Sequence, residues 1–234
     1  MNKYVKQHHA ITEARYDLSA IEKNMFYLLL GALKDDDPPE KEYLVDISKS
    51  PVLKDVPLEE LRHAARNLLS RPYYINKPNG NILAVTLMTR VSYDETTALL
   101  GIVVARQMLP YLIDLKNDYT EFELDIALSL KSKYSKRIYE MLSHHKDAGI
   151  MHITVDELKY RLALKDPKKK KETYTWTPFK EVVLETAKKE LQEHADITFT
   201  YDAKKTGNKY TDLTFHITRS ENSRSNEAKA SSSS

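Results

Sequence analysis

Apolar residues recur along the chain with spacings that predict helices and strands in an order that occurs twice. In the first half, a 3.6-residue apolar stripe predicts a helix over residues 18–33, and Ser19 followed by Glu22 is the capping-box pattern of a helix start. Alternation predicts a strand over 43–47, and Pro57 marks the start of a second strong helix. The later elements expected in this half are strands at 73–76, 82–93 and 97–104 and a closing helix at 106–115.

The second half repeats this order of elements. The expected elements are a long helix at 125–146, a strand at 151–153, helices at 154–164 and 178–194, and strands at 197–201 and 210–217 joined by a polar, basic turn at 202–209. The inner side of the 178–194 helix is expected to consist of Phe179, Val182, Val183, Ala187 and Leu191. A winged helix has this order of helix, strand, helix, helix and hairpin. The second helix of its helix-turn-helix, the recognition helix, can enter a DNA major groove. We therefore predict an α+β fold of two tandem winged-helix domains, residues 1–118 and 119–219, with residues 220–234 as a polar, disordered tail.

Composition removes several classes of protein. The chain has no cysteine, which excludes disulfides and thiolate chemistry, and it has neither an apolar run of about 18 residues nor a signal-peptide core. Glycine-rich phosphate-binding motifs do not occur, so we expect no nucleotide or other cofactor. We expect a soluble, cytoplasmic protein without membrane contact.

The distribution of charge is more informative than the net charge of +2. Residues 1–120 carry 15 basic and 16 acidic side chains, and the remainder carries 21 basic and 18 acidic ones, so the second half is the basic half. One segment there, LKSKYSKRIYEML at residues 130–142, combines an apolar stripe with a polar side that is expected to hold Lys133, Lys136 and Tyr139. Lys131 and Arg137 are expected at the borders of that stripe.

Basic residues of the second half fall on the elements with which a winged helix contacts DNA. Phosphate binding requires Lys and Arg side chains spread over one surface, because each neutralised phosphate releases counterions. The candidates are Lys131, Lys133, Lys136 and Arg137 on the long helix, Lys168 and Lys169 in a loop, Lys180 and Lys188 on the recognition helix, and Lys204, Lys205 and Lys209 in the wing. The start of the recognition helix, at Thr175, Trp176, Thr177 and Lys180, is the expected base reader. Acidic residues on the same helix, such as Glu181, repel phosphates but can accept from the cytosine amino group.

Three features leave alternatives open. Trp176 is either a base-edge reader or a core residue. Arg62 and Arg66, on the second helix of the first half, either contact phosphates or belong to a solvated face. The apolar strand at 82–91 is either an inner strand or an edge that pairs with another subunit.

Catalytic candidates are few. The adjacent pairs His8-His9 and His144-His145 point in different directions on a strand or helix and do not form a chelate. We expect no catalytic and no metal site, although the 15 tyrosines leave a nicking enzyme with a tyrosine nucleophile as an alternative.

Three segments resemble one known family. The family is that of iteron-type plasmid replication initiator proteins, the initiator Rep family. Its opening resembles residues 11–19 (ITEARYDLS) with Glu22, and its distinctive internal stretch resembles residues 130–142. Its DNA-reading helix resembles residues 176–191. The resemblance covers about residues 5–219.

This resemblance implies a bacterial, plasmid-encoded protein without enzymatic activity. Its expected partners are double-stranded DNA, namely iteron repeats at an origin and an inverted repeat at its own operator, and the host replication initiator and replicative helicase. It also implies a homodimer formed through the N-terminal domain. The alternative function is a winged-helix transcriptional repressor without a role in replication.

Overall fold

The computed structural model describes residues 3–77, 79–94, 97, 99–113, 115–165 and 173–220. The chain forms two compact units, Met1–Lys133 and Tyr134–Ser234. We predicted a boundary after Asp118, but residues 119–133 pack with the first unit. The reason is that strand β7 (Tyr119–Glu123) pairs antiparallel with β1 (Tyr4–His8), so the two ends of the first unit lie side by side.

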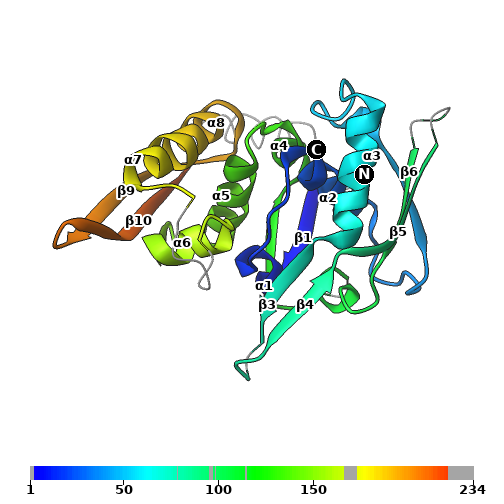
Figure 1. The fold of residues 1–234 in the computed structure, drawn as a ribbon, viewed down its shortest axis with the longest axis horizontal. Helices are drawn as coiled ribbons and strands as arrows, with labels where there is room; N and C mark the ends of the chain where they lie inside the picture. The colour runs from blue at the N-terminus through cyan, green and yellow to red at the C-terminus, as the bar shows by residue number, and fades with distance from the viewer. Residues whose placement is uncertain are drawn as a thin grey trace, which may run out of the picture. The chain divides into compact units, whose positions relative to one another are not determined.

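The second unit is a winged helix (Figure 1). Its elements are α5 (Lys133–His144), β8 (Ile150–Thr154), α6 (Val155–Arg161), α7 (Trp176–Phe179), η3 (Lys180–Glu185), α8 (Thr186–His194), β9 (Ile197–Thr206) and β10 (Lys209–Arg219). Strand β10 lies between β8 and β9 and pairs antiparallel with both. The predicted order of helix, strand, helix, helix and hairpin is confirmed.

The first unit repeats that plan with additions. The matching elements are α2 (Ala20–Ala32), β2 (Glu42–Asp46), η1 (Ile47–Lys49), α3 (Leu58–Ser70), β5 (Met88–Asp94) and β6 (Leu99–Val104). The strand order β2-β6-β5 corresponds to β8-β10-β9 of the second unit. The additions are α1 (His9–Glu13), β3 (Pro72–Asn76), β4 (Ile82–Thr86), η2 (Leu109–Tyr111) and α4 (Leu124–Ser129), together with β1 and β7.

Two predicted elements of the first unit take a different form. The strand expected at 82–93 is two strands separated by Leu87: β4 pairs with β3, and β5 pairs with β6. Ile82 is 59% exposed and no residue of β4 is buried, so the first of the two alternatives, an inner strand, does not hold for this part of the segment. The helix expected at 106–115 is only the short 3-10 turn η2, which contains Pro110, a residue that cannot supply the backbone donor an α-helix needs.

The long helix expected at 125–146 is also two helices. Helix α4 ends at Ser129, whose hydroxyl donates to the Ile126 carbonyl, and Leu130 is extended. Helix α5 then begins at Lys133, and all its residues from Tyr134 to Ser143 are buried. Within the described part of the chain, no helix combines the length and the apolar character that crossing a bilayer requires.

The predicted capping box stabilises the first unit. The Ser19 hydroxyl accepts from the backbone N–H of Glu22, and the Glu22 carboxylate accepts from the backbone N–H of Ser19 at 2.8 Å. Glu22 is almost fully buried, and it also accepts from Asn67 at 2.8 Å and from Arg71 at 3.2 Å. This one carboxylate therefore joins the start of α2 to the end of α3.

We expect Glu22→Ala to lower the free energy of unfolding by about 2 kcal/mol, because it removes a cap and leaves partly buried donors without an acceptor. Urea unfolding measures the change. Glu59→Ala is the matched control, since Glu59 is exposed and pairs with the exposed Arg62 in the next turn, and it should cost less than about 1 kcal/mol. Equal stability of Glu22→Ala and the wild type would refute this role.

Candidate nucleic-acid interface

The recognition helix of the second unit runs through α7, η3 and α8, from Trp176 to His194, and we call it the α7–α8 helix. Its buried side consists of Phe179, Val183, Leu184, Ala187 and Leu191. Val182, which we predicted inside, is exposed instead, because η3 is a π-helical turn that shifts the spacing of the buried residues. The five-residue step from Phe179 to Leu184 is the signal in the sequence that could have revealed this turn.

The start of the α7–α8 helix is attached to the wing by an aromatic stack. The Trp176 ring lies parallel to the Tyr210 ring of β10, with centroids 3.9 Å apart and an interplanar angle of 16°. The ammonium of Lys205 on β9 lies 4.5 Å from the Tyr210 ring centre. Trp176 is partly exposed, so it is not a fully buried core residue. Its ring packs against the wing. Tyr210 was missed by sequence reasoning.

A second attachment lies near the middle of the helix. The Tyr201 hydroxyl of β9 donates to the Glu185 carboxylate at 2.6 Å, and the Lys180 ammonium lies 4.0 Å from the same carboxylate. Burial, together with the hydrogen bond to Glu185, raises the pKa of Tyr201 above its usual value, so the hydroxyl remains a donor at neutral pH. Glu185 therefore fixes the helix to the sheet and orients Lys180, which is a candidate base reader.

The wing is longer and more ordered than the polar turn that we predicted at 202–209. Strands β9 and β10 pair up to Thr206 and Lys209, and a two-residue turn of Gly207 and Asn208 joins them. Gly207 has φ +61°, as in hairpin turns with glycine at the first central position. All three predicted wing lysines, Lys204, Lys205 and Lys209, are exposed on this hairpin.

The basic segment 130–142 does not form the predicted cationic face. Lys136 and Tyr139 are fully buried, and Tyr139 donates to Asp196 at 2.8 Å. Arg137 is also buried and pairs with Glu140 at 2.6 Å, so its charge is compensated within the protein. The placement of Lys136 and Arg137 toward DNA was therefore wrong, because α5 is buried from Tyr134 to Ser143.

The other second-half candidates are placed as follows. Lys131 is exposed in the break before α5, and Lys133 lies 2.8 Å from Asp17 within the first unit. Thr177 and Glu181 are exposed on the α7–α8 helix, and Lys188 is partly exposed. Lys168 and Lys169 lie outside the described residues. The structure thus attaches the helix that carries Thr177, Lys180 and Glu181 to the hairpin that carries the wing lysines.

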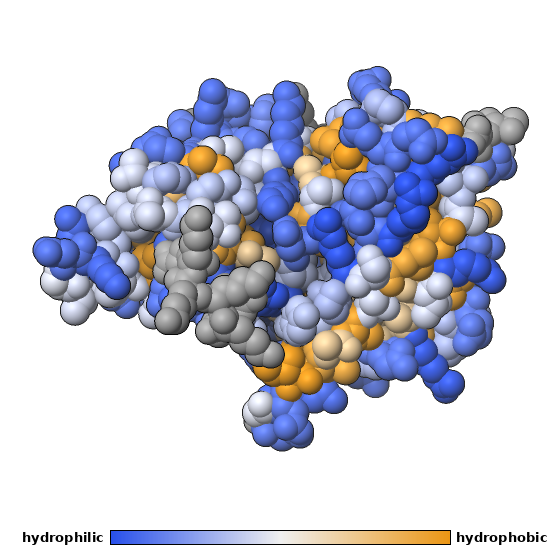
Figure 2. Space-filling view, in the orientation of Figure 1, coloured by the Kyte–Doolittle hydropathy of each residue, from blue (hydrophilic) through white to orange (hydrophobic). Residues whose placement is uncertain are grey.

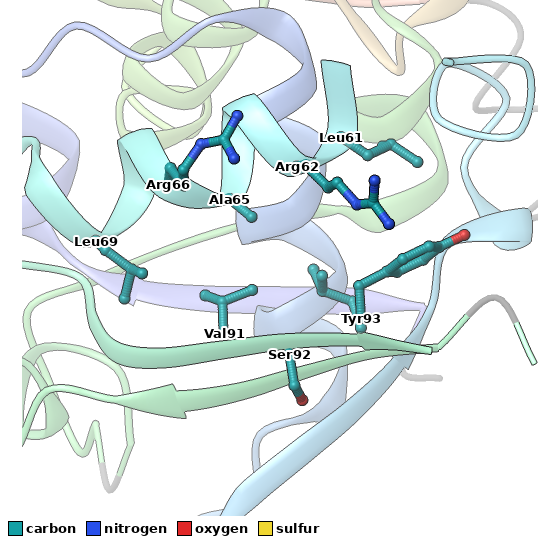
Figure 3. Close-up of a pocket in the computed structure, with 9 residues that line it drawn as sticks. Leu61, Arg62, Ala65, Arg66, Leu69, Val91, Ser92 and Tyr93 are labelled. Carbon is teal, nitrogen blue, oxygen red and sulfur yellow. The ribbon is translucent and has the colours of Figure 1, made fainter. Parts of the chain in front are cut away.

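Arg62 and Arg66 of the first unit border a groove between α3 and β5. In Figure 3, Ala65 and Leu69 point from α3 toward Val91. The Arg62 side chain extends toward Tyr93, whereas that of Arg66 extends away from the strand. Both arginines are exposed, and Arg62 pairs with Glu59 one turn earlier in α3. This groove corresponds in topology to the surface between the α7–α8 helix and the wing, but it carries fewer cations.

Comparisons with known proteins identify the family. The model described as "Initiator Replication protein, WH1" matches residues 4–143, and the model "Initiator Rep protein, WH2" matches residues 154–217. The chain therefore belongs to the family of initiator replication proteins, as the resemblance of three sequence segments predicted. The two matches also confirm the tandem winged-helix fold.

Individual relatives are more distant. A probable replication protein of Bifidobacterium longum is 31% identical over 36% of this chain and 28% of its own length. A replication initiation protein of Escherichia coli is 27% identical over 65% of this chain and 52% of its own length, so the match spans about half of that relative. Among solved structures, Pi initiator protein in complex with iteron DNA superposes with a TM-score of 0.77 at 20% identity, covering 94% of this chain and all of that one, which supports the fold.

We expect Tyr210→Ala to move the fluorescence emission of the protein to longer wavelength, because Trp176 is the only tryptophan and loses its stacking partner to water. The free energy of unfolding should also fall by about 1 kcal/mol or more. Tyr210→Phe keeps the ring and should leave the emission unchanged. Identical spectra of Tyr210→Ala and the wild type would contradict the stack.

Proposed function

We propose that this protein initiates plasmid replication by binding repeated duplex sites, the iterons, at an origin. Membership of the initiator family supports the class of function, and the complex of Pi initiator protein with iteron DNA supports the kind of site. The observation that carries the proposal is the surface of the second unit, where a helix with exposed polar side chains and a lysine-bearing hairpin are fixed to each other.

In this proposal the α7–α8 helix lies in the major groove and the wing lies along the phosphates. Thr177, Lys180 and Glu181 occupy the first turns of the helix, the part that reads base edges in helix-turn-helix proteins. Lys204, Lys205 and Lys209 neutralise phosphates, and Lys188 and Lys189 add charge farther along the helix. The two attachments of helix to wing keep these groups in register before DNA binds.

The remaining roles are proposed from family membership. The first unit adds a second DNA contact through Arg62 and Arg66 and forms the homodimer that represses the gene at an inverted repeat. Origin opening brings in the host replication initiator and the replicative helicase. The protein acts in the bacterial cytoplasm on a plasmid that encodes it, without catalysis, metal or cofactor of its own.

The unpaired edge of β4 supports the dimer proposal. Strand β4 belongs to a two-stranded sheet in which β3 is its partner, and the described residues place no strand along its other edge. Ile82 on β4 is exposed, which is the feature expected of an edge that pairs with a second subunit.

We expect the double change Lys204→Ala with Lys209→Ala to weaken binding to all duplexes about equally and to reduce the slope of log affinity against log salt by about 2, because two phosphate contacts are lost. Fluorescence anisotropy over a salt series measures both quantities. Lys136→Met is the control, since Lys136 is buried, and it should leave the slope at the wild-type value. The reverse pattern of slopes would contradict this placement of the interface.

Replication initiation and repression alone differ in one outcome in the cell. We expect a plasmid with this gene and its upstream repeats to be lost when a frameshift interrupts the gene, and to be maintained again when the intact gene is supplied in trans. Transformation and copy-number measurement test this. Continued replication of the frameshifted plasmid would support the alternative, a winged-helix repressor with no role in replication.

A further inference from the structure

The α7–α8 helix contains a π-helical turn, η3, between two α-helical segments. A π-helical turn contains one residue more than an α-helical turn. In a regular α-helix, Phe179 and Leu184 would point about 140° apart, because each residue turns the helix by about 100°. Both side chains are nevertheless fully buried, so the π turn brings them to the same side.

Side-chain contacts across five residues hold the turn in place. The Thr186 hydroxyl donates to the Glu181 carbonyl at 3.1 Å, and Lys180 reaches Glu185 at 4.0 Å. Both pairs are five residues apart, a separation that the wider turn brings to one side of the helix. Since Tyr201 in turn holds Glu185, the π turn is tied to the sheet as well.

Val182 is the residue that the π turn moves outward. It is 40% exposed, whereas Val183 and Leu184 are fully buried. If Val182 is left out of the residue count, the spacing of the buried side chains becomes i, i+3, i+4, i+7, i+11, as in a regular amphipathic α-helix. These side chains are Phe179, Val183, Leu184, Ala187 and Leu191. The core therefore does not require this valine, which lies within the π turn and on the outer side of the helix.

The surroundings of Val182 are polar. In Figure 2, a small apolar spot interrupts the hydrophilic surface over the α7–α8 helix, and Val182 is the large apolar residue of this helix that is exposed. Its neighbour Glu181 is exposed as well, and so is Thr177 one turn earlier. A β-branched side chain has few rotamers, so its methyl groups occupy defined positions on this surface.

We propose that Val182 reads thymine by contacting its C5-methyl group in the major groove. This inference rests on the proposed function, because it places the α7–α8 helix in that groove. The thymine methyl is the apolar feature of the major-groove edges, and apolar side chains are its usual contacts. Glu181 beside it can accept from a cytosine amino group, so the two neighbouring residues match features of the two pyrimidines.

The test uses the full-length chain and the duplex of highest affinity recovered from a random pool. Each thymine of that duplex is replaced in turn by deoxyuridine, which removes only the methyl group. At one position the wild-type protein should bind the deoxyuridine duplex about fourfold more weakly, the value expected for losing one buried methyl contact. Val182→Ala should bind the two duplexes equally at that position.

Lys189→Ala is the matched control, since Lys189 is exposed on the same helix and carries charge instead of an apolar group. It should weaken binding to both duplexes by the same factor and keep the wild-type ratio. Thermal unfolding of each variant establishes that the fold is retained. A wild type that is indifferent to every deoxyuridine, or a Val182→Ala variant that keeps the wild-type ratio, would overturn the inference while leaving sequence-specific binding intact. A pool that yields no preferred sequence would overturn the proposed function as well.

Discussion

The α7–α8 helix has to keep its apolar side on the sheet of the second unit while its outer side stays available and correctly oriented. Two contacts with the hairpin meet this requirement, the stack of Trp176 on Tyr210 and the hydrogen bond from Tyr201 to Glu185. Because they lie in different turns of the helix, they restrain both its tilt and its rotation about its own axis. A reading helix and a phosphate-binding wing are useful together only if their relative position is set in this way.

The fold was largely predictable from the sequence. The capping box of Ser19 and Glu22 and the apolar stripes of α2 and α3 are local signals, and the structure places helices where these signals predict them. The errors occurred where tertiary contacts decide. The antiparallel pairing of β1 with β7, which moves residues 119–133 into the first unit, joins segments more than a hundred residues apart, and spacing along the chain does not show such a pairing.

The candidate site was predictable only in part. Lys204 and Lys209 are exposed on the hairpin, as expected of wing residues, although they lie on the two strands and not in a turn. The pattern of 130–142 was misleading, since a helix can bury lysine and arginine when partners such as Glu140 are inside the fold. Val182 was misplaced because periodicity analysis assumes an unbroken α-helix, and a π turn violates that assumption.

The central claim is that DNA lies on the α7–α8 helix and the wing, and not on α5. Acetylation of lysine side chains in the free and the DNA-bound protein, quantified by mass spectrometry, tests this claim most directly. The account predicts that Lys189, Lys204 and Lys209 react in the free protein and are protected by DNA, and that Lys136 is unreactive in both states. Hairpin lysines that react equally with and without bound DNA, or a reactive Lys136 that DNA protects, would contradict it.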